Sequence, residues 1–137
     1  MFCRLIGLFF LLLTQCVCYA QMSFSTRTFV VSNTSDLAFT LQLRPFEGSQ
    51  FSEIPLKLLP GEEVKTTLSS IDNVRNANGV IVFQMDARYV FSLVIKDAIV
   101  SVHGCKSKPV FFHPEEYVCL LTDSDNGEKR LMIQRPS

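Results

Sequence analysis

Large apolar residues occupy every second position in several stretches of this chain. In residues 37–43 they are Leu, Phe, Leu and Leu, and the residues between them are small or polar. Because successive side chains of a β-strand point to opposite faces, a period of two places the four large side chains on one face. Val64, Thr66 and Leu68 repeat the alternation. The pattern predicts strands buried on one face, as in an antiparallel sheet.

Turn residues divide the chain into short segments of this kind. The expected strands are residues 27–32, 37–43, 54–59, 62–68, 80–84, 89–95, 98–102, 117–122 and 130–134. We expect residues 27–32 and 37–43 to pair as a hairpin across the Asn-Thr-Ser-Asp turn at 33–36. Lys96-Asp97 is expected to link a second hairpin, and Asn126-Gly127 to form the type I′ turn of a third.

Three segments refine this prediction. Pro55 cannot donate to a ladder, so residues 54–59 are expected at a sheet edge. Residues 80–84 are almost continuously apolar, which predicts a central strand covered on both faces. Residues 69–79 fit either a short helical turn or an Asn-rich crossover loop. Seven to nine short strands at near-regular spacing predict an all-β fold, a single antiparallel Ig-like β-sandwich.

The first 20 residues have the composition of a cleaved signal peptide. Arg4 gives a positive start, residues 5–13 are almost wholly apolar, and Cys18 and Ala20 supply small residues before a cleavage site. A membrane anchor and a lipidated Cys16 are the alternatives, but the apolar run is shorter than the roughly 20 residues of a spanning helix. We expect residues 1–20 to be removed, leaving a secreted or periplasmic domain over residues 21–137.

The balance of positive and negative residues argues against partners that are bound through their negative charge. The chain has 13 Lys plus Arg and 13 Asp plus Glu, and loss of the leader removes only Arg4, which changes the formal net charge from 0 to −1. This balance offers no electrostatic basis for binding nucleic acid or an anionic membrane surface. No other apolar run approaches membrane length, so we expect no membrane span in the mature chain.

Two of the five cysteines, Cys105 and Cys119, lie outside the leader. An even pair in an exported domain predicts one disulfide. It would close a loop of about 15 residues, which is worth on the order of 3 kcal/mol in the chain-entropy account.

Residues 27–68 contain a characteristic order of strand and turn residues. It consists of Ser32-Asn33-Thr34-Ser35-Asp36, Gln42, Phe51, Pro55 and Leu59-Pro60-Gly61-Glu62-Glu63. This order resembles the N-terminal Ig-like domain of periplasmic pilus-assembly chaperones, which implies an Ig-like architecture. Those chaperones have two domains, and their leading strand carries a basic anchor for the subunit carboxylate. Residues 21–26 do not match that strand, so the resemblance transfers no functional residue.

His103, Cys105, His113 and Cys119 have the side-chain chemistry of zinc or copper ligands. Their spacing matches no compact metal motif, and a disulfide beside two loop histidines explains the same residues. Nucleophilic catalysis needs a Ser or Cys beside an oriented His. Both histidines lie in one loop and there is no Gly-x-Ser-x-Gly sequence. We therefore expect no enzyme and no cofactor.

Two further motifs have alternative interpretations. Asn33-Thr34-Ser35 is a glycosylation sequon, or a turn whose side chains bond the nearby backbone. Phe111, Phe112 and His113 form either an exposed binding loop or a lid folded over the end of the sandwich.

We expect a small exported β-sandwich that works by binding another protein, along a strand edge or through residues 103–116. Strand pairing gains affinity from backbone hydrogen bonds and needs no special side chains. The alternative is a metal-handling protein that uses His103 and His113 to bind zinc or copper.

Overall fold

The structure, a computed structural model, describes residues 25–107, 117–124 and 126–135. The expected signal peptide, residues 1–20, lies outside these residues. Ten strands occur in the described part. They are β1 (Thr26–Asn33), β2 (Phe39–Pro45), β3 (Ser49–Phe51), β4 (Lys57–Leu58), β5 (Glu63–Ser70), β6 (Gly79–Met85), β7 (Arg88–Lys96), β8 (Ile99–His103), β9 (Val118–Asp123) and β10 (Lys129–Gln134).

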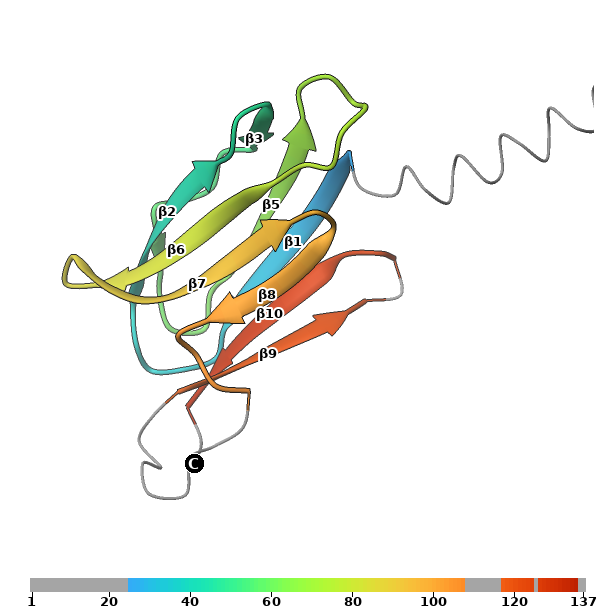
Figure 1. Cartoon of the computed structure of the whole chain (residues 1–137). Coiled ribbons are helices and arrows are strands. Elements are labelled where there is room, and N and C mark those ends of the chain that lie inside the picture. The colour runs from blue at the N-terminus through green and yellow to red at the C-terminus, as the bar shows by residue number, and fades with distance from the viewer. Residues whose placement is uncertain (1–24, 108–116, 125, 136–137) are drawn as a thin grey trace, which may run out of the picture.

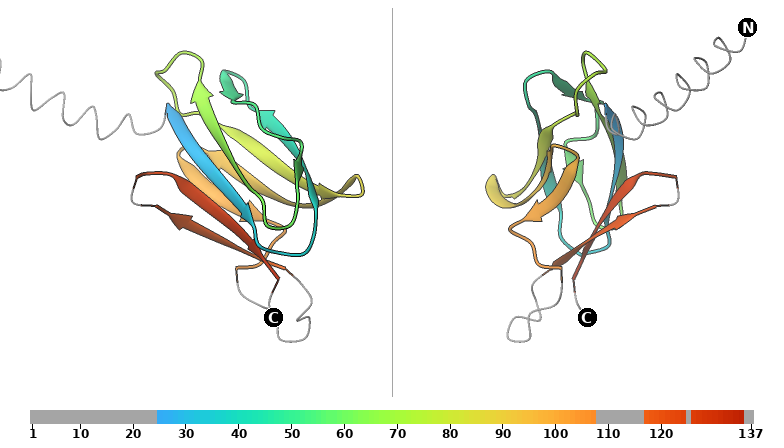
Figure 2. Two further views of the ribbon diagram at one scale, coloured as in Figure 1. Left: turned by 180° about the vertical axis from the view of Figure 1, so that it is seen from behind. Right: turned by 45° about the vertical axis from the view of Figure 1, so that its right-hand side comes forward.

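The strands form two five-stranded sheets that face each other as a β-sandwich (Figures 1 and 2). The first sheet has the order β3-β5-β1-β10-β9 and the second the order β4-β2-β6-β7-β8. The all-β sandwich predicted from the sequence is confirmed. The described residues contain one strand more than the nine predicted segments, because the short edge strand β3 lies where the sequence predicted no strand. The described residues include no helix long and apolar enough to cross a membrane.

Phenylalanine rings fill the middle of the core. Phe83 and Phe91 are directly opposite each other on β6 and β7, and their rings stack with centroids 4.3 Å apart. Phe39 on β2 meets both rings edge-on, at 6.3 and 5.6 Å. All three are buried. Leu41 is buried with them, which confirms the core face predicted for residues 37–43.

The predicted hairpin between residues 27–32 and 37–43 is wrong. β1 pairs with β5 and β10 in the first sheet, whereas β2 pairs with β4 and β6 in the second. The chain crosses the sandwich between Asn33 and Phe39, because both edges of β1 are already occupied. The alternating residues Phe39 and Leu41 are therefore buried from the opposite sheet, across the core from β1, and β2 is not a neighbour of β1.

One strand pair also departs from the antiparallel expectation. β1 and β10 run parallel, with Val31 opposite Leu131, and the other strand pairs of the described residues are antiparallel. Parallel strands cannot be joined by a tight turn. Here the two strands come from opposite ends of the sequence, and the rest of the domain forms the connection.

Asn33 explains how the crossover is held. Its side chain is completely buried. The amide Nδ2 donates to the carbonyl oxygens of Leu37 and Leu58, at 2.6 and 3.4 Å. The Oδ1 atom accepts from the backbone N–H and the hydroxyl of Ser35, at 3.1 and 2.5 Å. The turn interpretation of the sequon is therefore confirmed, and this side chain is not presented to solvent in the folded protein.

Two-residue loops with positive φ join β6 to β7 and β7 to β8. The second hairpin was predicted, but its loop is Asp97-Ala98, one residue later than expected. Its φ angles of 52° and 68° are those of a type I′ turn, and Asp86-Ala87 has the same geometry. The β9–β10 hairpin is also confirmed. It closes through Ser124 N–H to Glu128 O, so the loop has three residues and not two, with Gly127 at φ 84°.

The remaining expectations hold in part. β4, within residues 54–59, is an edge strand, and residues 71–78 form a loop and no helix. β6 is the central strand of its sheet, as predicted. Val80 and Val82 point away from the core, and among the described residues no third layer covers them. The outer face of β6 is thus apolar, and Val82 on it is nevertheless only 8% exposed.

Candidate functional site

The two flanks of the sandwich differ in the length of their edge strands. On one flank the edges are β3, with three residues, and β4, with two. On the other flank they are β8, with five residues, and β9, with six, which lie at the same side of the molecule in Figure 1. Very short edge strands are one way in which proteins prevent unwanted pairing. The flank formed by β8 and β9 therefore offers the longer free edges.

The backbone of β8 has hydrogen-bonding groups that its neighbour β7 does not use. The two-residue loop makes Lys96 and Ile99 a hydrogen-bonded pair, and such pairs alternate along an antiparallel ladder. Val100 and Val102, opposite Ile95 and Leu93, therefore direct their N–H and C=O groups away from β7. No strand of the described residues other than β7 pairs with β8.

The side chains of β8 are uncharged from Ile99 to Val102. Val100 and Val102 face the core and pack against its margin. On the outer face Ile99 is 70% exposed. Beside it lie Ser101 and His103, whose Oγ and Nε2 atoms are 3.0 Å apart. A free edge usually carries a lysine, a proline or an inward charge, and β8 has none of these.

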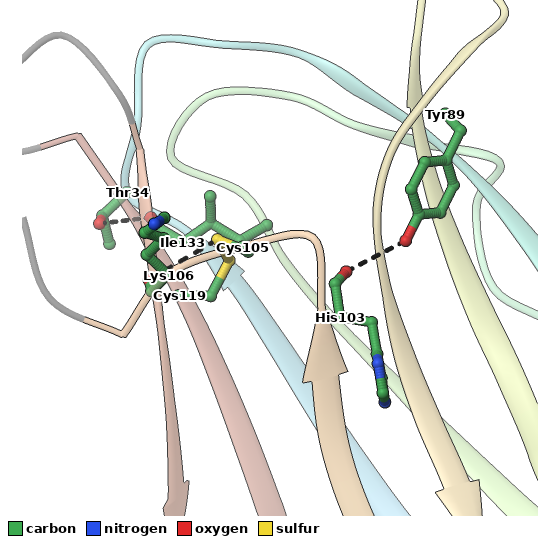
Figure 3. Close-up of a disulfide and its surroundings, with 7 residues drawn as sticks. All are labelled: Thr34, Tyr89, His103, Cys105, Lys106, Cys119 and Ile133. Carbon is green, nitrogen blue, oxygen red and sulfur yellow. Dashed lines mark hydrogen bonds between the residues drawn. A yellow bond between two sulfur atoms is a disulfide. The ribbon is translucent and has the colours of Figure 1, made fainter. Parts of the chain in front are cut away.

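Both ends of β8 are fixed. At its start the carbonyl of Ala98 accepts a hydrogen bond of 3.2 Å from Arg27 Nη1, on β1 of the opposite sheet. At its end the Tyr89 hydroxyl donates to the carbonyl of His103 at 3.1 Å (Figure 3). Gly104 follows with φ 86°, and a Cβ there would lie 3.0 Å from the carbonyl oxygen of Val90. The strand is therefore preorganised before any partner binds.

The predicted disulfide between Cys105 and Cys119 is present, with Cα atoms 5.9 Å apart (Figure 3). It joins the residue after Gly104, just beyond β8, to β9 in the other sheet. Cys119 N–H also donates to the carbonyl of Lys106 at 2.9 Å, and Lys106 bridges to Val118. The crosslink thus ties the two sheets together on the flank where both edges are long.

Less of the β9 edge than of the β8 edge is available for pairing with another strand. The first residues of β9 are covered by the contacts of Lys106 just described. At its other end Asp123 forms an ion pair of 2.7 Å with Lys129. The hydrogen bond from Lys129 lowers the pKa of Asp123, and the positive charge of Arg27 adds to this effect. A partner strand on β9 would meet a covered end and a charged end, so β8 is the better candidate edge.

The predicted metal set does not come together in the described residues. Cys105 and Cys119 are bonded to each other, and the His103 ring points away from them (Figure 3). The described residues contain no group of three or more His, Cys, Asp or Glu that could hold a metal ion. His113, Phe111 and Phe112 lie outside the described residues. The histidine hypothesis therefore gains no support from the part that is described.

A polar pocket of about 390 Å³ lies at one end of the sandwich. Several of the polar groups that line it are hydrogen-bonded within the surrounding loops. Asn78 accepts from the N–H of Asp97 at 2.9 Å and donates its own N–H to Ser49 Oγ at 3.0 Å. Arg75 pairs with Asp72 at 2.7 Å. These bonds give Ser49, Asn78 and Arg75 a structural role in the loops.

Sequence reasoning named the strand edge as a mode of binding but did not identify β8. The signal was a run of uncharged, mostly β-branched residues, Ile-Val-Ser-Val, at the end of a hairpin. Which edge stays free depends on the order of strands in the sheet, and local sequence does not give that order.

A scan against protein-family models finds no match, and a search of curated proteins also finds none. Among solved structures the chain is similar to IP-1A from Alcaligenes faecalis, with a TM-score of 0.60 and 8% sequence identity. The match covers 82% of this chain and 92% of IP-1A. At this identity the likeness supports the β-sandwich fold and nothing more specific.

Proposed function

We propose that this protein is an exported, non-enzymatic binding module that contacts a partner protein through the free edge of β8. The observation that supports this best is the set of backbone groups of Val100 and Val102 directed away from β7. Export is supported by the Cys105–Cys119 disulfide, which is typical of oxidising compartments, and by the signal-like composition of residues 1–20.

The energetics favour a contact that extends past the backbone. Four hydrogen bonds at Val100 and Val102 would contribute about 2–6 kcal/mol, at roughly 0.5–1.5 kcal/mol each. Burying Ile99 would add up to about 2 kcal/mol. Association costs about 4–15 kcal/mol in lost translational and rotational freedom. A stable complex therefore also needs apolar side-chain contacts along the edge, where Val100 and Val102 lie partly buried at the margin of the core.

The first test uses a photo-crosslinking amino acid in the exported protein. It replaces Ile99 on β8 or, as a matched control, Leu56, which is 72% exposed and lies before β4 on the opposite flank. We expect protein adducts at position 99 and few at position 56. Equal labelling at both positions, or none at 99, would contradict a contact at β8.

A second test removes one backbone donor. Val100→Pro deletes an N–H that points away from β7, so the β7–β8 ladder keeps its own bonds. We expect this change to abolish the adduct at position 99 while a circular dichroism melt still shows a cooperative fold. Leu121→Pro, on the edge of β9, is the control and should leave the adduct in place. Loss of the adduct only in the Leu121→Pro variant would indicate that the partner binds at β9 and not at β8.

A further inference from the structure

We infer that the partner of β8 is a second copy of this chain, paired antiparallel about a two-fold axis at Ser101. This inference rests on the proposed function, because it names the occupant of the same strand edge. Two copies would then share one continuous sheet with five strands from each.

The register follows from the backbone groups of β8 that no described residue pairs with. In an antiparallel ladder the two residues of a hydrogen-bonded pair exchange both N–H···O bonds. With the axis at Ser101, Val100 of each copy faces Val102 of the other, and all the free groups of these residues pair, giving four bonds. An axis at Val100 would place Val102 opposite Ala98, whose carbonyl already accepts from Arg27. An axis at Val102 would place Val100 opposite Gly104, which lies outside the strand.

The side chains are compatible with self-pairing. In a contact about a two-fold axis, a residue near the axis lies close to the same residue of the other copy, so a charged residue would face a like charge. Like charges directly opposite each other are destabilising. Ile99 to Val102 carry no charge, so this penalty is absent. Ile99 would lie opposite His103 of the second copy, and its 70% exposed side chain would gain a neighbour. Val100 and Val102, now at the margin of the core, would lie between two strands and no longer at an edge.

The alternative edge is less suited to a second copy. On β9 the N–H of Cys119 is already bonded to Lys106, and Asp123 carries a charge held by Lys129. Short β3 and β4 offer at most three residues each. Among the edges of the described residues, β8 combines a usable length, free backbone groups and no charge.

A cysteine at the axis tests the register directly. Residues of a non-hydrogen-bonded antiparallel pair have Cα atoms about 4.5 Å apart, which is within the range for a disulfide. Ser101→Cys should therefore form a covalent dimer on mild oxidation, seen on a non-reducing gel and located by peptide mapping. Ile99→Cys is the control. Position 99 is more exposed than position 101, but position 99 of the second copy would lie about 14 Å away along the strand. The Ile99→Cys variant should therefore crosslink at least tenfold more slowly.

A charge at the axis provides a second test that does not depend on a new thiol. Ser101→Lys would place two ammonium groups opposite each other on the outer face. We expect at least a tenfold weaker dimer in analytical ultracentrifugation, with partial recovery at high salt because screening reduces the repulsion. Arg44→Lys, on the same face but on β2, should leave dimerisation unchanged.

The outcomes separate the two proposals. Faster crosslinking through position 99 than through 101 would overturn the register and with it this inference. A native protein that stays monomeric at all concentrations, yet gives an adduct at position 99 with a different protein, would overturn the second copy and retain the β8 contact. A monomer without any adduct at position 99 would overturn both.

Discussion

Asn33 is the residue whose removal should damage the fold most for its size. Its side chain holds the crossover between the sheets, and it is buried although it is polar. Asn33→Ala would leave the carbonyl of Leu37 and the N–H of Ser35 without their present partners. A lost bond to a group that water can reach costs about 1 kcal/mol, and a buried unsatisfied group about 1–3 kcal/mol. We expect a loss of about 2–4 kcal/mol in the free energy of unfolding.

The assay is urea unfolding followed by circular dichroism, with a thermal melt as a check. For a domain of this size 1 kcal/mol corresponds to about 4 °C, so the melting temperature should fall by about 10 °C. Asn76→Ala is the matched control, because Asn76 is exposed in the β5–β6 loop, and it should change stability by less than about 0.5 kcal/mol. Equal effects of the two substitutions would refute the reasoning.

Asn33→Asp sharpens the test because it keeps the shape of the side chain. A carboxylate would meet the carbonyl oxygens of Leu37 and Leu58 without a proton to donate. Burial and this repulsion would raise its pKa above that of an unfolded Asp. Its destabilisation relative to the native protein should therefore shrink as the pH falls from 7 to 5, because protonation restores a donor. A destabilisation that does not vary with pH would contradict this account.

Three further predictions follow from the turns, the disulfide and an exposed carboxylate. Ala87→Gly and Ala98→Gly should each stabilise the protein by about 0.5–1 kcal/mol in urea unfolding. The reason is that the relief of strain at positive φ outweighs the greater conformational entropy that glycine gives the unfolded chain. No change in stability would show that the turns are unstrained. Cys105→Ala with Cys119→Ala should cost on the order of 3 kcal/mol, read from the shift of the urea midpoint, and an unchanged midpoint would contradict the crosslink. Hydrogen bonds from Ser70, Val74 and Arg75 lower the pKa of Asp72, so its stabilisation should be present above about pH 4 and lost as the pH falls further. Asp72→Asn should make the melting temperature less dependent on pH between 5 and 3, and an unchanged slope would count against this assignment.

Much of the local structure could be predicted from the sequence because it depends on near neighbours. Alternating Leu and Phe in residues 37–43 identified a strand and its buried face. Asn126-Gly127 identified a hairpin, and two remaining cysteines identified the disulfide. Asn33 was interpreted as a turn residue, which the buried side chain confirms. In each case the physical cause, a side-chain period, a backbone preference or a pair of thiols, lies within a few residues or in the composition.

The sequence alone, then, determined an all-β domain with a buried alternating face and one crosslink. Only the tertiary structure decided which strands are neighbours. It placed β2 in the sheet opposite β1, made β1 and β10 parallel, and left β8 at an edge with Val100 and Val102 turned outward. A strand's pattern shows which face it buries but not which strand lies beside it. That choice depends on how all ten strands together satisfy their backbone bonds and close one core, and the candidate site depends on the same choice.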